Sequence, residues 1–523
     1  MKQTSRNVLL ILILLLVISS GVVSAQETIW SGPFVLGTCC EPNSLDPAAM
    51  GPSQTEGYLI TAAYEGLTQY SREAEIIPRL ATSWEISDDA LTYTFTLREG
   101  VLFHDGTAFD ANAVKVSFER HIELGLGNLG FILAPVGEIS VIDDMTVQIT
   151  LNEPNFQFWS GLPHIKIVSP AAVEANELDD DLAHEFFRTN TVGTGPYQVT
   201  RWDPGRQTEL EAFEDYWNGW EGNHIQQLIV RYGLDYSTRL LLLEQGEVHM
   251  IDWAGLSDVR RAATNNSINL NFGNPLQGFY HFMKQDGPLA DVRVRQALMY
   301  AFPYDAMIEV MQGFAIPLTS PALAGTVGHC DVFEPVQDLD KARELLAEAG
   351  YPDGGFTLQQ AYRHANEPRR LAGQLYQEVL AELGIEVVLV DIPWGTFIDS
   401  QRQLDTAYDM TSHWVNIPIP YAGEMLFRLN HSSLIDTGTG NWAWYNNPAF
   451  DALLEEAPTL VPGDPRIDEL VCEAQQILID DAVVIPVMLS QYIDLTHASV
   501  QGYAFDPYGF PGDLHMYDIY LED

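Results

Sequence analysis

One segment, residues 81–120, carries more local structural information than any other part of the 523-residue chain. Apolar residues alternate with threonines over residues 91–97, which is the period of a half-buried β-strand. A cluster of turn residues precedes that strand, so residues 82–86 and 91–97 are predicted to pair as a hairpin. Asp110 has the chemistry of a helix N-cap, and a helix is predicted over 111–121.

The length and the charge narrow the class of protein. A chain of 523 residues exceeds what one hydrophobic core supports, so two or three domains are expected. Its apolar content of 46% argues against disorder, and its formal net charge of −46 excludes electrostatic binding to nucleic acid. The acidic residues are spread along the chain, which predicts a solvated acidic surface; adaptation to a saline habitat is the alternative.

The amino terminus has the pattern of an export signal over residues 1–25. Lys2 and Arg6 precede an apolar run at 8–18, and small residues follow at a cleavage site before Gln26. The run is too short to span a bilayer, which takes about 20 residues. We therefore expect an exported protein, periplasmic or at the extracellular face of the cell membrane. No cysteine stands at the cleavage site, so no lipid anchor is predicted.

The chain has four cysteines, at positions 39, 40, 330 and 472. An exported protein can form disulfides, and three pairings are possible on paper. A bond between the neighbours Cys39 and Cys40 would be strained, so a Cys330–Cys472 bridge is favoured. No cysteine has a second cysteine or a histidine at metal-ligand spacing, and no metal site is predicted.

Similar patterns predict an α/β fold along the rest of the chain. The expected elements are a strand at 29–37, a hairpin over 138–151, a helix start at 178–181, a strand–helix–strand unit over 225–251, helices at 340–350 and 367–383, a strand at 356–362, and an apolar strand at 385–390 of the kind buried in a parallel sheet.

The glycine motif at 125–130 spells GxGxxG, but it follows a predicted helix rather than a strand, so a dinucleotide cofactor is rejected. No GxSxG elbow occurs, and no catalytic residue is predicted.

Residues 81–120 resemble the signature segment of the family 5 solute-binding proteins of ABC importers, the oligopeptide-, dipeptide- and nickel-binding group. The matching positions are Trp84, Asp88, Tyr93, Thr94, Phe95, Leu97, Arg98, Gly100, Val101, Phe103, His104, Asp105, Gly106, Ser117 and Arg120. Segments at 41–47, 192–197, 213–219 and 288–298 also resemble family segments.

The resemblance implies a periplasmic-binding-protein-like clamshell of two lobes with an extra small domain, built from mixed sheets with flanking helices. The implied divisions are a signal peptide at 1–25, domain I at 26–62, 191–275 and 485–523, a small domain II at 63–190, and domain III, the second lobe, at 276–484.

A cluster of aromatic and amide side chains between 408 and 446 suits a pocket for a polar organic ligand. The resemblance adds a tryptophan near the ligand and an arginine that holds a ligand carboxylate. The predicted ligand-binding residues are Tyr362, Arg363, Trp394, Trp414, Asn416, Tyr421, Trp442, Trp444 and Tyr445.

Peptide-binding relatives grip the ligand's amino group with an aspartate shortly after a tryptophan that resembles Trp414. Here no acidic residue occurs before Glu424, so the partner of that amino group is missing or moved. A sugar oligomer is therefore an alternative to an oligopeptide as the predicted ligand.

These observations predict a protein without enzymatic activity or cofactor that captures a small organic ligand between two lobes. It is expected to act as a monomer and to deliver the ligand unchanged to the permease subunits of an ABC importer. An oligosaccharide-binding member of the same family is one alternative, and an exported hydrolase is the alternative from another class.

Overall fold

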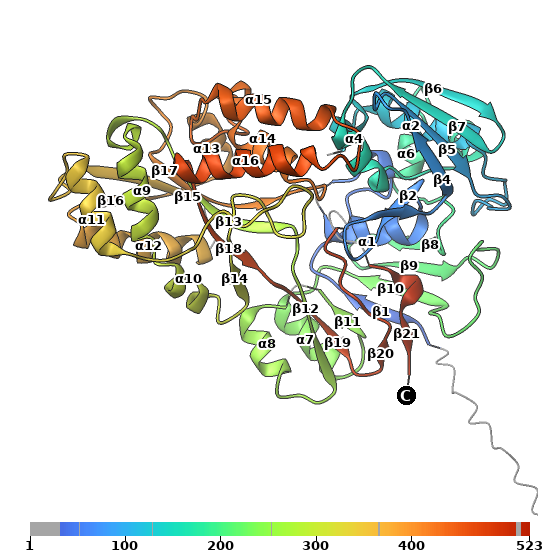
Figure 1. Cartoon of the computed structure of the whole chain (residues 1–523). Coiled ribbons are helices and arrows are strands. Elements are labelled where there is room, and N and C mark those ends of the chain that lie inside the picture. The colour runs from blue at the N-terminus through green and yellow to red at the C-terminus, as the bar shows by residue number, and fades with distance from the viewer. Residues whose placement is uncertain are drawn as a thin grey trace, which may run out of the picture.

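A computed structural model describes residues 32–51, 53–127, 129–252, 254–363, 367–508 and 514–522. The predicted export signal at 1–25 and the first residues of the strand expected at 29–37 lie outside the described residues. Three larger sheets, two two-stranded sheets (β2-β3 and β20-β21) and helices packed around them form the described part of the molecule, which is the mixed-sheet architecture that the resemblance implied (Figure 1). Among the described residues, no helix has the length and apolar composition that a membrane span requires.

The first sheet has seven strands in the order β12-β19-β11-β1-β10-β9-β8. β1 lies in the middle and pairs in parallel with β10 and β11, while the outer pairs are antiparallel. Their bounds are β1 Phe34–Gly37, β8 Tyr197–Asp203, β9 Gln207–Ala212, β10 Gln227–Arg231, β11 Met250–Ile251, β12 Ile268–Gly273 and β19 Tyr492–His497. Three separated parts of the chain therefore build one sheet.

The second sheet has six strands in the order β14-β18-β13-β17-β15-β16. Their bounds are β13 Gln277–Met283, β14 Ala315–Pro317, β15 Thr357–Arg363, β16 Glu386–Ile392, β17 Met410–Asn416 and β18 Val484–Ser490. β15 and β16 are parallel. The prediction that the strand at 385–390 is fully buried is wrong, because β16 is an edge strand and Val388 on it is 42% exposed.

The third sheet belongs to a small unit and has the order β4-β5-β7-β6. β4 (Ala81–Ile86), β5 (Thr92–Leu97), β6 (Val136–Asp143) and β7 (Thr146–Leu151) form the two predicted hairpins, which are confirmed. Helix α2 (Ala111–Leu124) covers this sheet, and the Asp110 carboxylate accepts the N–H of Ala113 as the predicted cap.

The predicted helix start at 178–181 is wrong. Asp181 accepts backbone N–H groups from Leu178 and Ala183, and residues 179, 180, 182 and 183 have positive φ angles, so this segment is a turn. Short polar side chains that bond to nearby backbone compete with helix formation in this way. The expected helices at 340–350 and 367–383 are confirmed as α11 (Leu339–Glu348) and α12 (Glu367–Glu382).

The remaining helices and strands connect or cover the sheets. They are α1 Gln54–Ala63, β2 Thr68–Tyr70, β3 Ile76–Pro78, α3 Gly130–Leu133, α4 Phe156–Gly161, α5 Pro170–Asn176, α6 His184–Phe187, α7 Tyr236–Glu244, α8 Leu256–Ala262, α9 Val292–Ala301, α10 Tyr304–Val310, α13 Trp394–Ser400, α14 Ala422–Asn430, α15 Pro448–Glu456, α16 Arg466–Asp480, β20 Val500–Gln501 and β21 Tyr520–Leu521.

Two short connections join the seven-stranded and six-stranded sheets. One runs from β12 to β13 through residues 274–276, and the other runs from β18 to β19 through Gln491. The Gln491 side chain donates to the Asn274 side chain at 3.2 Å, so the two connections lie side by side. The domain boundary expected at 485 falls inside β18, which belongs to the six-stranded sheet. The other domain bounds stay predictions.

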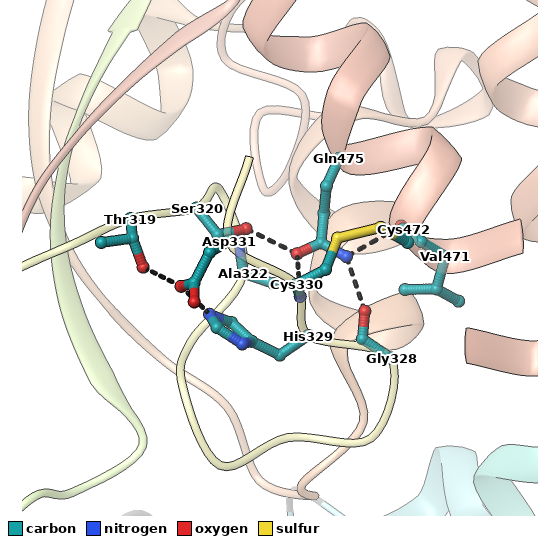
Figure 2. Close-up of a disulfide and its surroundings, with 10 residues drawn as sticks. All are labelled: Thr319, Ser320, Ala322, Gly328, His329, Cys330, Asp331, Val471, Cys472 and Gln475. Atoms are coloured by element: carbon teal, nitrogen blue, oxygen red, sulfur yellow. Dashed lines mark hydrogen bonds and ion pairs between the residues drawn. A yellow bond between two sulfur atoms is a disulfide. The ribbon is translucent and has the colours of Figure 1, made fainter. Parts of the chain in front are cut away.

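Both pairs of cysteines form disulfides. The favoured Cys330–Cys472 bridge is confirmed and fastens the segment at 319–331 to α16 (Figure 2). Buried Gln475 reinforces it, because its side chain accepts from Ser320 at 2.5 Å and donates to the Gly328 carbonyl at 2.6 Å. The neighbours Cys39 and Cys40 are also joined, although the sequence favoured only the other pair.

Candidate functional site

A cavity of about 500 Å³ lies where the two larger sheets meet, beside the two connections. The seven-stranded sheet contributes residues at or near the carboxyl ends of β1 and β11, and the six-stranded sheet contributes the beginning of β13 and the end of β17. The lining residues are Thr38–Glu41, Asn43, Ser53–Thr55, Tyr58, Met250, Asp252, Pro275–Gln277, Asn416, Ile417, Tyr492, Asp494, Tyr503 and Phe505–Tyr508. Ligands in open α/β sheets bind outside the carboxyl ends of parallel strands, and this cavity has that position.

The cavity is acidic. Its described lining residues include four carboxylates but no lysine, arginine or histidine; the acids are Glu41, Asp252, Asp494 and Asp506. Because the buried guanidinium of Arg239 balances Asp252, the charge that favours a positively charged ligand comes from Glu41, Asp494 and Asp506.

Two of the carboxylates accept hydrogen bonds from their surroundings. Asp494 accepts from the Tyr503 hydroxyl at 2.5 Å, and Asp506 accepts from His515 Nε2 and from the Tyr508 backbone N–H, both at 2.8 Å. Burial, reinforced by Asp494, raises the pKa of Tyr503. Tyr503 therefore remains a neutral donor to the Asp494 carboxylate.

The other two carboxylates organise the walls. Asp252 is buried and forms an ion pair with Arg239, which is 1% exposed, and it accepts from the Thr38 hydroxyl at 2.8 Å. Glu41 accepts from the Trp202 indole at 3.1 Å and from the Gly205 N–H at 3.0 Å. These contacts fix the segment that follows β1.

Aromatic rings supply much of the remaining wall: Tyr58, Tyr492, Tyr503, Phe505 and Tyr508. Rings beside a few polar groups are typical of pockets for small organic ligands. Tyr508 also borders a second cavity of about 520 Å³, whose walls include Trp159 of the small unit and Asp464 and Asp468 of the second lobe.

Among the predicted ligand-binding residues, Asn416 lines the cavity of about 500 Å³ between the two larger sheets, which we call the inter-sheet cavity. It lies at the end of β17, and its side-chain oxygen accepts from the Gln277 amide. Trp414, two residues earlier, packs against Phe279 with ring centroids 4.9 Å apart.

Three other predicted residues meet at a second place in the six-stranded lobe. Trp394 and Trp442 lie with ring centroids 5.7 and 4.2 Å from His413, and the Arg363 guanidinium lies 6.0 Å from the Trp394 ring. Burial lowers the pKa of His413 well below its ordinary value, so this imidazole is neutral. Trp394 is 40% exposed.

The remaining predicted residues lie in packed positions. Tyr362 is largely buried on β15, and Tyr421 contacts Phe156 of the small unit with ring centroids 4.7 Å apart. The Tyr445 hydroxyl donates to Asp481 at 2.6 Å, and Trp444 next to it has a φ of 55°. None of these is among the residues that line the cavity, and their role in ligand binding stays a prediction.

Sequence reasoning predicted none of the four cavity carboxylates, at 41, 252, 494 and 506, as a ligand-binding residue. Asp252 directly follows β11, so the rule on strand ends could have identified it. Asp494 lies inside β19 and Asp506 in a later loop, and no local pattern indicates that they share a cavity with Glu41. Among the described residues, no group of three or more histidine, cysteine or acidic side chains could hold a metal ion.

Two lobes joined by paired connections, with a cavity beside those connections, define a two-lobed solute-binding protein. A family model described as bacterial extracellular solute-binding proteins, family 5 middle, matches residues 75–435. The chain belongs to this family of extracellular solute-binding proteins. The family consists of non-enzymatic binding proteins, which removes the hydrolase alternative.

Individual relatives agree with this assignment. The heme-binding protein A of Haemophilus influenzae is 29% identical over 503 residues, covering 91% of this chain and 90% of that protein. The glutathione-binding protein GsiB of Pectobacterium atrosepticum is 32% identical over 389 residues, covering 72% of this chain and 73% of that protein. The solved structure of HbpA2 from Haemophilus parasuis has a TM-score of 0.84 at 26% identity and covers 94% of this chain and 100% of that one.

Proposed function

We propose that this protein captures a peptide-class ligand bearing an ammonium group in the cavity between its lobes and delivers it unchanged to an ABC importer permease. In this proposal the protein is exported, carries its ligand as a monomer, and faces the outer side of the cell membrane. Its relatives are named for heme, glutathione and dipeptides, so the family accommodates several organic ligands.

The observation that carries the proposal is the acidic cavity at the connections between the two sheets. A ligand there touches residues of both lobes, such as Asp494 on one side and Asn416 on the other. Only contacts made to both lobes can favour a closed arrangement over an open one. Closure around the ligand then removes it from water, as in other hinged binding proteins.

The carboxylates favour a peptide over a sugar. The sequence lacks an acidic residue shortly after Trp414, yet Asp494 and Asp506 reach the cavity from the carboxyl-terminal part of the chain. An ammonium group placed beside them would have charged acceptors, which a sugar hydroxyl does not need. The aromatic walls are the feature that supports the oligosaccharide alternative.

Thermal melting with a panel of ligands tests this proposal. Trilysine should raise the melting temperature in a concentration-dependent way, because a ligand that binds only the folded state stabilises it. Fully N-acetylated trilysine and maltotriose should leave it unchanged, and mass spectrometry should recover trilysine intact. A shift with maltotriose alone would support the sugar alternative, and cleavage of trilysine would contradict the proposal.

A further inference from the structure

The two disulfides differ in what they can do for stability. Cys330 and Cys472 are 142 residues apart, so their bond closes a long loop and restricts the unfolded chain. Cys39 and Cys40 are adjacent, and a bond between neighbours closes no loop of intervening residues. The Cys39–Cys40 bond therefore adds little to the free energy of unfolding through loop closure, and its presence needs another explanation.

The position of this bond is informative. Both cysteines follow the end of the central strand β1, both are exposed, and both line the ligand cavity. The bond is therefore within reach of a ligand and of a small reagent in the solvent.

The residues on either side of the pair are fastened. The Thr38 N–H donates to the Arg231 carbonyl at 2.8 Å, and its hydroxyl donates to Asp252. The Cys39 carbonyl accepts from the Gly233 N–H at 3.0 Å. On the far side, Glu41 is held by its bonds to Trp202 and Gly205. The backbone on both sides of the pair is thus held in place at the cavity wall. The sulfur–sulfur bond is the part of this wall that a reductant can change.

We propose that Cys39–Cys40 is a reducible wall of the ligand cavity, whose disulfide form binds ligand tightly and whose dithiol form binds it weakly. This inference rests on the proposed function. The site accepts a small dithiol, or the dithiol of a thiol–disulfide oxidoreductase, as its reductant.

The reaction is a thiol–disulfide exchange. A thiolate of the reductant attacks one sulfur of the pair, a mixed disulfide forms, and the other cysteine leaves as a thiolate that takes a proton from water. The second thiol of the reductant loses its proton to water and its thiolate displaces the first cysteine, which leaves as a thiolate and also takes a proton from water. The reductant thereby becomes a disulfide and the protein holds two thiols. Two electrons and two protons pass from the reductant to the protein.

Reduction opens the small ring that joins Cys39 to Cys40 and frees both side chains to change rotamer. A wall that must be ordered again when ligand enters binds more weakly than one fixed in advance. We expect the affinity for trilysine to fall by about tenfold on reduction.

Graded reduction with dithiothreitol tests the site itself. Thiols are trapped by alkylation at each step and located by peptide mass spectrometry. The Cys39–Cys40 bond should open at lower reductant than the Cys330–Cys472 bond, whose cysteines are both partly buried. Equal resistance of the two bonds, or thiols at 39 and 40 in the untreated protein, would overturn the inference and leave the proposed function intact.

Titration with trilysine tests the consequence. The protein reduced only at 39 and 40 should bind about tenfold more weakly than the oxidised protein. A Cys39→Ser/Cys40→Ser variant should bind with the weaker affinity both with and without dithiothreitol. As a matched control, a Cys330→Ser/Cys472→Ser variant that remains folded should keep the full response to dithiothreitol. Unchanged affinity on reduction would overturn this inference alone, whereas no binding to the oxidised protein would overturn the proposed function as well.

Discussion

The small four-stranded unit and the inter-sheet cavity are built in opposite ways. The small unit comes from one stretch of chain, and its strands pair with neighbours that are close in sequence. The cavity takes residues from both ends of the chain, including Thr38 and Tyr508, and from both larger sheets. The small unit is formed by residues close in sequence around an apolar core, whereas the cavity is formed by residues far apart in sequence and has acidic walls.

This difference separates stability from affinity. Tyr93 and Phe95 of the small unit are fully buried, so changes there should unfold the protein without altering the ligand site. Asp494 and Asp506 contribute charge to a cavity, so changes there should alter binding and leave the fold in place. A variant in either region that lowered both the free energy of unfolding and the ligand affinity would contradict this separation of stability from binding.

The largest effect is expected from Phe95→Ala in the small unit. Phe95 is 0% exposed on β5, and truncating a buried phenylalanine costs about 3–5 kcal/mol of the free energy of unfolding. Urea denaturation measures this loss. The neighbouring Thr96 is exposed on the same strand, so Thr96→Ala should cost less than about 1 kcal/mol. Equal losses in the two variants would contradict the buried position of Phe95.

A slightly smaller effect is expected at the contact between the small unit and the first lobe. Asp46, at 0% exposure, forms a bidentate ion pair with Arg120 of α2, with both oxygen–nitrogen distances at 2.7 Å. Removing one partner leaves a buried charge, so Asp46→Asn should lower the free energy of unfolding by about 3 kcal/mol. Glu119→Gln, which breaks the exposed pair with Lys115, should change it by less than about 1 kcal/mol. Similar losses in both variants would show that the Asp46 pair is solvated.

The cavity should respond in affinity. Asp494→Asn keeps an acceptor for the Tyr503 hydroxyl but removes the charge, so affinity for trilysine should fall about tenfold, or about 1.4 kcal/mol. Isothermal titration calorimetry measures the change. Asp399→Asn is the matched control, because Asp399 is 83% exposed and lies outside the lining residues of the cavity. If Asp494→Asn lowered the free energy of unfolding as much as Phe95→Ala does, the distinction between the two regions would be wrong.

The smallest effect concerns pH. The hydrogen bond to Asp46 raises the pKa of His184. Burial alone would raise the pKa of Asp46, but the hydrogen bonds from Arg120 and His184 outweigh burial and lower the pKa of Asp46 to about 2. Because the folded-state pKa of His184 is raised, its contribution to stability is complete below pH 6.5 and is lost as pH rises through that pKa. Asp46 has a depressed pKa, so its contribution is present above pH 3.8 and is lost as pH falls towards 2.

Melting temperatures of wild type and His184→Gln between pH 5 and 8 measure the histidine contribution. Wild type should be the more stable at the acidic end, and the difference should shrink as pH rises. His184 is 26% exposed, so water screens the pair and the effect is modest. A difference that grows with pH would contradict the sign of the shift.

The local elements could be predicted from the sequence, and the cavity could not. The alternation of Tyr93 and Phe95 with threonines and the cap at Asp110 indicated their elements correctly, because these patterns depend on near neighbours. The helix start predicted at 178–181 is wrong because aspartate bonds to nearby backbone. The strand predicted at 385–390 is confirmed as β16, but its burial is not, because its place at a sheet edge depends on the whole topology.

The site was harder, because its members meet only in the folded chain. Asn416, which the sequence predicts as a ligand contact, lines the cavity, but the carboxylates at 494 and 506 come from a different segment of the chain that no local pattern connects to it. The Cys39–Cys40 bond was discounted as strained, although it lies at a cavity wall held by contacts from Thr38 and Glu41.

Calorimetric titration of the oxidised protein with trilysine and with its fully N-acetylated form tests the central claim most directly. Trilysine should bind with one molecule per protein and be recovered intact, and the acetylated form, which lacks the ammonium groups, should give no binding heat. Equal binding of the two forms, or binding of neither, would contradict capture of a cationic ligand in the acidic cavity between the lobes.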